Sequence, residues 1–103
     1  MFSRKDAISY SKAFLKACNG LPVKISKAVL FGSTVRSKAK KNSDIDIALF
    51  SDSFGDNILK NLDLIGKVAI KFPDIDVHTF SNKSYKTSSV MMEEIKKTGI
   101  ILL

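Results

Sequence analysis

Cysteine is almost absent from this sequence, and arginine is rare. Cys18 is the only cysteine, so the chain can form no internal disulfide and no cysteine-based zinc cluster. Of the 17 cationic residues, only Arg4 and Arg36 are arginine. Because arginine is the residue suited to bidentate recognition of bases and phosphates, the charge indicates general electrostatics rather than sequence-specific reading of DNA.

Long apolar segments are also missing. The first ten residues, MFSRKDAISY, lack the apolar stretch of a signal peptide. No apolar run approaches the length of about 20 residues that a membrane-spanning helix needs. From these absences we expect a cytoplasmic protein with no membrane partner.

The sequence shows no internal repeat, no low-complexity segment and no linker. A chain of 103 residues with 45% hydrophobic and 26% charged residues has the composition of an ordinary globular protein. We therefore expect one domain over residues 1–103. The formal net charge of +7 favours an anionic partner such as a nucleotide, a nucleic acid or an acidic protein, but it fits a solvated lysine-rich surface equally well.

The hydrophobic pattern alternates between helical and extended segments. Apolar residues at helical spacing predict helices that start at the N-cap Ser3 and end at Asn19-Gly20, that run over 57–72, and that run over 90–97. Apolar runs predict strands over 24–31, 44–50 and 74–80 and a short final strand within 100–103. Residues 81–89, SNKSYKTSS, are expected to form a loop. The pattern indicates an α/β protein.

Two of the predicted strands carry paired aspartates. In DIDIALF, Asp44 and Asp46 lie on one face of the strand, and in DIDVHTF, Asp74 and Asp76 do the same. If the strands are neighbours, three or four carboxylates converge at one end of the sheet, where their mutual repulsion favours a bound cation. Carboxylate oxygens together with substrate phosphates suit Mg²⁺. The alternative is that these aspartates are turn residues or caps.

A Gly-Ser step precedes the first aspartate pair. Gly32 follows a predicted strand, where the absence of a Cβ lets the backbone approach a ligand closely. Backbone N–H groups after Gly32 and the hydroxyl of Ser33 could bind a phosphate at the start of a short turn. Taken alone, such a step is commonly just a turn.

Together these segments resemble the signature of the nucleotidyltransferase superfamily related to DNA polymerase beta, and best its small stand-alone members, the minimal nucleotidyltransferases. That signature has Gly-Ser, then Arg, a basic or small-residue loop, and Ser-Asp-x-Asp followed by apolar residues. The matching residues here are Gly32, Ser33, Arg36, Ser43, Asp44 and Asp46. The family's third carboxylate, on a later strand between apolar residues, corresponds to Asp76. The ending MMEEIKKTGIILL also resembles the family's C-terminal helix and strand.

The resemblance implies a polymerase beta-like nucleotidyltransferase fold, a small mixed sheet with helices packed on it. It implies transfer of a nucleoside monophosphate, with AMP favoured, from a nucleoside triphosphate such as ATP to a hydroxyl acceptor. Asp44, Asp46 and Asp76 would be the catalytic and metal-binding residues for two Mg²⁺ ions, with Mn²⁺ as a substitute. Gly32, Ser33 and Arg36 would bind the nucleotide, and Asp76 could accept the proton of the acceptor hydroxyl.

The same resemblance suggests a biological setting. Minimal nucleotidyltransferases are often paired with a small helical partner of the HEPN class in toxin–antitoxin modules, and some add AMP to the toxin. The alternative is a non-catalytic nucleotide- or partner-binding module of the same fold, which neutralises a toxin by contact alone. A nucleic-acid binder ranks last, because the basic segments lack interleaved aromatic residues. The sequence leaves open whether the protein forms a homo-oligomer.

A few further residues have competing interpretations. Many family members have glycine after the arginine, whereas this chain has Ser37, a difference that affects the loop and not the carboxylates. Arg36 could neutralise phosphates or form a structural salt bridge. His78 lies two residues after Asp76 and points the same way, but a lone histidine near a strand end is more often a hydrogen-bonded or exposed side chain than a catalytic one.

Overall fold

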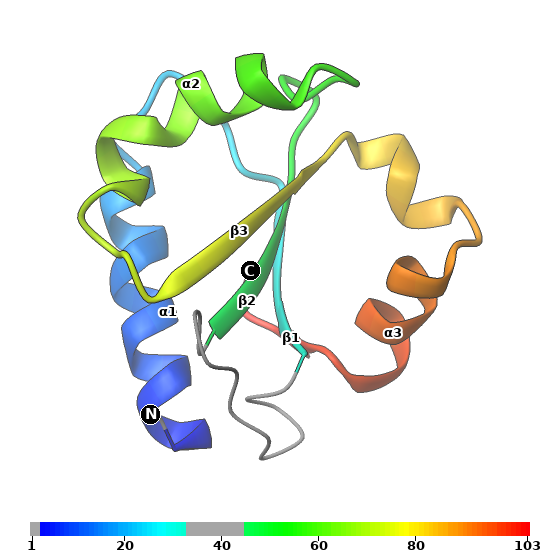
Figure 1. The fold of residues 1–103 in the computed structure, drawn as a ribbon, viewed down its shortest axis with the longest axis horizontal. Coiled ribbons are helices and arrows are strands. Elements are labelled where there is room, and N and C mark those ends of the chain that lie inside the picture. The colour runs from blue at the N-terminus through cyan, green and yellow to red at the C-terminus, as the bar shows by residue number, and fades with distance from the viewer. Residues whose placement is uncertain (1–2, 33–44) are drawn as a thin grey trace.

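The computed structural model describes residues 3–32 and 45–103 (Figure 1). The described helices are α1 (Arg4–Cys18), α2 (Ile58–Ala69), the short 3₁₀ helix η1 (Asn82–Lys86) and α3 (Val90–Thr98). The described strands are β1 (Lys27–Phe31), β2 (Ile45–Phe50), β3 (Ile75–Phe80) and β4 (Ile100–Ile101). No helix in these two ranges is long and apolar enough to cross a membrane.

Each α-helix begins with a side-chain cap. The Ser3 hydroxyl accepts a hydrogen bond from the backbone N–H of Asp6, as the sequence predicts, at 3.1 Å. The side chain of Asn57 caps α2 in the same way, and that of Ser89 caps α3. Such a bond satisfies one of the backbone donors that have no partner inside the helix, so these residues determine where the helices start.

The strands form one mixed sheet in the order β3-β2-β1-β4. β1 pairs antiparallel with β2 and with β4, whereas β2 and β3 run parallel. A parallel pair needs a crossover connection, and α2 supplies it between β2 and β3. The parallel register places Asp46 directly opposite Asp76.

Both faces of the sheet are covered, which gives three layers (Figure 1). One face packs against α1 and α2 through Ile45, Ile47 and Leu49 of β2, together with Phe14 of α1 and Ile65 of α2. The other face packs against α3. Its core consists of Val29, Phe31, Ala48, Phe50, Met92 and Ile95. Alternate residues of β2 therefore enter different cores, and Asp46 lies on the α3 face together with Ala48 and Phe50.

Three sequence-based predictions differ from the structure by more than one residue. The predicted loop 81–89 contains η1. The strand predicted from Lys24 begins at Lys27, which pairs with the last residue of β2, Phe50. The helix predicted to reach Phe72 ends at Ala69 and continues as turns, in which Lys71 donates to Val68 and Phe72 donates to Ala69.

Candidate nucleotidyl-transfer site

Gly32, at the end of β1, lies against the side chain of Asp46. Its φ of +87° belongs to the left-handed region, which residues with a Cβ rarely adopt. A Cβ built on Gly32 would overlap the Asp46 carboxylate. The glycine therefore lets the end of β1 turn while the buried carboxylate packs against its backbone.

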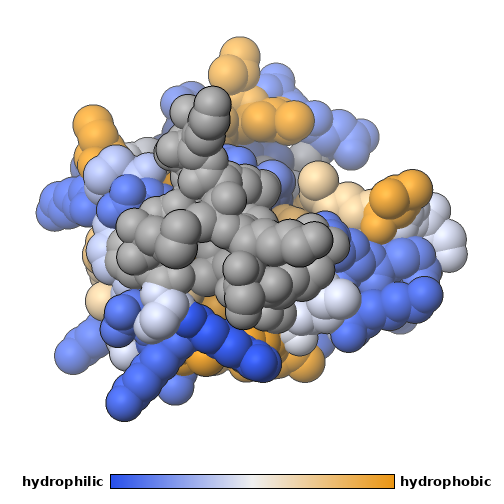
Figure 2. All heavy atoms as spheres, turned by 60° about the horizontal axis from the view of Figure 1, so that its bottom comes forward, coloured by the Kyte–Doolittle hydropathy of each residue, from blue (hydrophilic) through white to orange (hydrophobic). Residues whose placement is uncertain are grey.

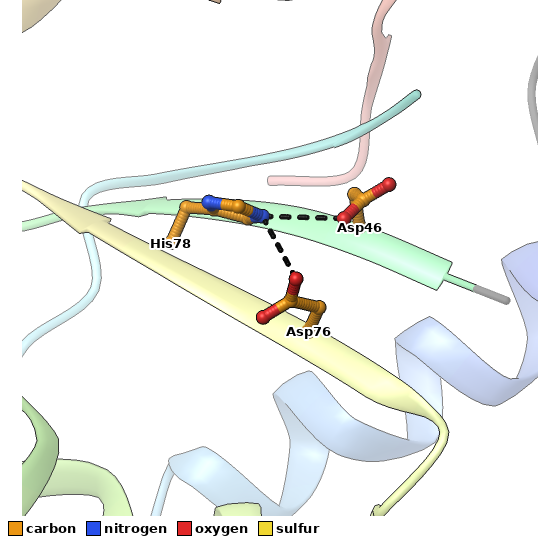
Figure 3. A group of neighbouring side chains, drawn as sticks. All are labelled: Asp46, Asp76 and His78. Atoms are coloured by element: carbon orange, nitrogen blue, oxygen red, sulfur yellow. Dashed lines mark hydrogen bonds and ion pairs between the residues drawn. The ribbon is translucent and has the colours of Figure 1, made fainter. Parts of the chain in front are cut away.

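The two predicted carboxylates of β2 and β3 are neighbours. Asp46 and Asp76 face each other in the parallel register, so both lie on the sheet face that α3 covers. Figure 3 shows both carboxylates close to the imidazole of His78. Their environments differ, because the Asp46 side chain is 1% exposed and the Asp76 side chain is 53% exposed. One carboxylate is thus fixed inside the molecule, and the other is open to an incoming molecule.

His78 completes the cluster. Its Nε2 atom lies 3.2 Å from Oδ1 of Asp46 and 3.6 Å from Oδ2 of Asp76 (Figure 3). The imidazole packs edge-on against the ring of Phe31, with 5.2 Å between ring centroids. The sequence favoured a hydrogen-bonded or exposed side chain at this position, and the structure confirms a hydrogen bond between His78 and Asp46. The available signal was its position on the same strand face as Asp76, but the proximity to Asp46 depends on the pairing of β3 with β2.

These three side chains fit a divalent cation. One ligand atom from each of Asp46, Asp76 and His78 lies within 4.8 Å of the other two. Carboxylate oxygens are the usual protein ligands of Mg²⁺, and imidazole nitrogen is a ligand for transition metals. A cation at this point would also offset the repulsion between two carboxylates that the register places side by side.

Not every predicted site residue can be placed. Ser33, Arg36 and Asp44 lie outside the described residues, as does Ser37. The last of the four aspartates in the predicted strands, Asp74, is among the described residues. It is not part of the Asp46–Asp76–His78 cluster. It lies instead near Tyr10 of α1: burial raises the pKa of Tyr10, and the Asp74 carboxylate raises it further.

An apolar groove of about 340 Å³ adjoins the cluster along β3, which is one of the two edge strands of the described sheet. His78 lines both the groove and the cluster, and the groove is otherwise lined by Ile58, Leu62, Val77, Thr79, Phe80 and Met91. Several of these side chains are open to solvent, with Ile58 64% exposed and Met91 42% exposed. The groove thus extends the site outward between α2 and α3.

The surface on the side of the molecule at the bottom of Figure 1 is mainly hydrophilic in its described part. Figure 2 shows hydrophilic side chains on most of the described surface of this face, with apolar side chains in separate groups. The formal net charge of +7 makes the whole chain attractive to anions. This charge is compatible with a polyanionic substrate such as a nucleoside triphosphate.

Comparisons with known proteins agree with this geometry. The family model Polymerase beta, Nucleotidyltransferase matches residues 15–103. A search of curated proteins gives no significant match. Among solved structures, a putative nucleotidyltransferase from Sulfolobus solfataricus is similar in fold, with a TM-score of 0.66, 15% identity, and coverage of 95% of this chain and 80% of that chain.

Two further solved structures are toxin–antitoxin complexes. One, a toxin–antitoxin with AMP-PNP, has a TM-score of 0.62 and 27% identity, with 91% of this chain and 72% of that chain covered. The other contains a tri-AMPylated Shewanella oneidensis HEPN toxin with an MNT antitoxin, with a TM-score of 0.56 and 24% identity, and coverage of 97% of this chain and 71% of that chain. The described sheet, the paired aspartates and the family match agree, and the chain belongs to the polymerase beta nucleotidyltransferase family.

Proposed function

We propose that this protein transfers AMP from ATP to a hydroxyl group on a protein partner of the HEPN class, as the antitoxin of a toxin–antitoxin pair. The observation that carries the proposal is the juxtaposition of Asp46 and Asp76 on parallel strands next to Gly32, in a chain of the nucleotidyltransferase family. The toxin–antitoxin structure with AMP-PNP and the complex with a tri-AMPylated toxin support the choice of nucleotide and partner.

The residues can be assigned distinct tasks. The backbone after Gly32, with Ser33 and Arg36, would bind the triphosphate. Asp44, Asp46 and Asp76 would hold two Mg²⁺ ions, which Mn²⁺ could replace. Bound cations of this kind neutralise phosphate charge and stabilise the attacking and leaving oxygens. Asp46 suits a fixed role because it is buried and contacts His78.

Asp76 suits a role in proton transfer because more than half of its side chain is exposed. In the proposed reaction the acceptor oxygen forms a bond to the α-phosphorus, the bond from that phosphorus to the bridging oxygen breaks, and pyrophosphate leaves. The hydroxyl proton passes to the Asp76 carboxylate. A general base must reach the proton it accepts, and an exposed carboxylate beside the groove meets that requirement.

The groove favours a macromolecular acceptor over a small one. Its apolar side chains Ile58, Leu62 and Met91 are exposed in the chain as described. A protein partner could cover them and bring a hydroxyl to Asp76, because protein interfaces bury exposed apolar side chains, methionine among them.

The test is an intact-mass measurement. The protein is incubated with Mg²⁺, each of the four ribonucleoside triphosphates in turn, and a HEPN-type protein from the same genome. We expect the partner to gain one or more AMP units with ATP only. Asp76→Asn should abolish the gain, and Asp63→Asn, which removes an exposed carboxylate of α2, should not.

Two outcomes would count against the proposal. Absence of any mass gain with all four nucleotides, while the partner is still neutralised, would support the non-catalytic binding module instead. A mass gain that survives Asp76→Asn would remove that residue from the reaction.

A further inference from the structure

His78 occupies the position of a third ligand in the described cluster. Its Nε2 atom faces both carboxylates, at 3.2 Å from Asp46 and 3.6 Å from Asp76, and its other ring nitrogen points away from them (Figure 3). Ligands that bind one cation at about 2.0–2.2 Å lie roughly 3.0–3.6 Å apart when they are adjacent in an octahedral or tetrahedral shell. The observed separations from Nε2 to the two oxygens match that spacing.

Packing holds the imidazole in this orientation. The ring contacts Phe31 edge-on and is only 24% exposed, and Phe31 belongs to the core between the sheet and α3. Phe31 is also paired with Asp46 in the antiparallel register of β1 and β2. The same local structure therefore positions the buried carboxylate and the ring, which is how a preformed ligand set is built.

We propose that His78 is a direct metal ligand, and that the Asp46–Asp76–His78 site consequently prefers a divalent transition metal ion such as Mn²⁺ over Mg²⁺. This inference deepens the proposed function, on which it rests for the location of the site. It adds a nitrogen ligand to a reaction centre otherwise made of carboxylates.

The preference follows from ligand chemistry. Mg²⁺ is a hard cation that favours oxygen ligands and releases its water reluctantly. Imidazole is a softer ligand that suits transition metals, and among these Mn²⁺ is the ion that also suits carboxylate ligands. Adding an imidazole nitrogen to the two carboxylates therefore strengthens Mn²⁺ binding more than Mg²⁺ binding.

The opposing interpretation gives His78 a positioning role only. In that case the imidazole donates a hydrogen bond to Asp46 or Asp76 and never contacts the ion. Loss of the imidazole would then lower the affinity for Mn²⁺ and for Mg²⁺ to a similar extent, because the orientation of the carboxylates matters equally for either cation. Direct contact with the metal and the ratio of the two affinities separate the interpretations.

The direct test uses the fact that the chain contains a single histidine. Protein without a histidine tag is loaded with Mn²⁺ in the absence of nucleotide, and its electron spin-echo envelope modulation (ESEEM) spectrum is recorded. We expect modulation from a nitrogen bound to Mn²⁺, which can be assigned to His78 without mutagenesis. The signal should vanish in His78→Gln and persist in Asp63→Asn.

The affinity test uses the same variants. In titration calorimetry, His78→Gln and His78→Ala should lower the Mn²⁺ affinity by about ten-fold or more and change the Mg²⁺ affinity by less than about three-fold. Circular dichroism and urea denaturation establish that each variant is folded. Two substitutions of different size are used because one of them could disturb the packing against Phe31.

Absence of nitrogen modulation in wild type, or an equal loss of Mn²⁺ and Mg²⁺ affinity, would overturn the ligand assignment. The proposed function fails separately, through the absence of AMP transfer with either metal. Nitrogen-ligated Mn²⁺ without transfer would leave His78 as a ligand in a site with another task, and transfer without nitrogen ligation would remove only the role of His78.

Discussion

At the scale of single residues, Gly32 is restricted by two independent constraints. Its φ of +87° is costly for residues with a Cβ, and the space where a Cβ would lie is taken by Asp46. Gly55 offers a contrast, because a Cβ built there has no heavy-atom neighbour within 4 Å. The two glycines therefore form a matched pair for mutagenesis.

We expect Gly32→Ala to lower the free energy of unfolding by about 1–3 kcal/mol, since a left-handed conformation alone costs roughly 1–2 kcal/mol. It should also weaken nucleotide binding, because the Asp46 carboxylate must move. Gly55→Ala should change stability by less than about 1 kcal/mol. Urea denaturation and nucleotide titration measure both effects, and equal behaviour of the two variants would contradict the assigned role of Gly32.

Cys18 is a second residue whose surroundings have a measurable effect, in this case on how stability depends on pH. It is buried at the end of α1, and burial raises the pKa of its thiol to about 11. In the unfolded chain the thiol ionises near pH 8.5. The folded state therefore keeps a proton that the unfolded state loses, and the resulting stabilisation is complete below about pH 8.5 and disappears as the pH rises toward 11.

We accordingly expect wild type to lose roughly 2 kcal/mol more stability than Cys18→Ala between about pH 8.5 and pH 11. The variant is the control for lysine and tyrosine titration, which is common to both proteins. Urea denaturation across this pH range gives the difference, and parallel curves would show that the thiol environment does not differ between the folded and unfolded states.

At the scale of secondary-structure elements, Asn61 joins three parts of the chain. It lies on α2 and is buried, its amide donates to the backbone oxygen of Gly55 at 2.8 Å and to Thr79 of β3 at 3.1 Å, and its oxygen accepts from the N–H of Gly55 at 3.0 Å. These bonds fix the crossover helix to the edge strand that carries Asp76.

Asn61→Ala should therefore cost about 2–4 kcal/mol, because it removes three hydrogen bonds and leaves part-buried groups without their partner. Asn82→Ala is the control. Asn82 also makes two side-chain hydrogen bonds, to Ser26 and Asp52, but both are exposed. We expect a loss below about 1 kcal/mol there, and a comparable loss in both variants by urea denaturation would argue against the bridging role of Asn61.

The elements also show what sequence patterns could and could not predict. Ser3 and Asn19 predicted the two ends of α1 because helix capping is a local effect. The start of β1 at Lys27 was not predictable, because it depends on where its partner β2 ends. The 3₁₀ helix η1 was missed because none of its residues is buried, so it leaves no apolar periodicity to detect.

The candidate site was also predictable from the sequence only in part. From sequence, the alternation of side chains predicted that Asp46 shares a strand face with Asp44, and that Asp76 shares one with Asp74. The family resemblance then singled out Asp46 and Asp76, among the acidic residues, as site residues. The parallel register, the separation of Asp74 from the cluster and the contact between His78 and Asp46 are properties of strand pairing. No single segment of sequence contains that information.

At the scale of the whole molecule, ligand binding should be visible as stability. Metal and nucleotide together, at about ten times their dissociation constant, should add roughly 1.4 kcal/mol and raise the melting temperature by about 5–10 °C. Asp76→Asn should abolish this rise. In EDTA the same variant should be as stable as wild type or up to about 1 kcal/mol more stable, because one of two facing carboxylates is neutralised.

Differential scanning fluorimetry with and without Mg²⁺ or Mn²⁺ and ATP measures the shift, and urea denaturation in EDTA measures the metal-free stability. A rise that is unchanged in Asp76→Asn would place the metal elsewhere. Clear destabilisation of the metal-free variant would mean that Asp76 is a structural residue.

The parallel pairing of β2 with β3 also has a kinetic consequence. The two strands are separated by α2 and cannot meet through a hairpin, so their contact requires closure of a long loop, which is a slow and late type of folding event. Asp46 and Asp76 come together only when that closure is complete. A nascent or partly folded chain in which β3 has not docked therefore cannot form the metal site, and the ability to bind metal through both aspartates is acquired only with the finished sheet.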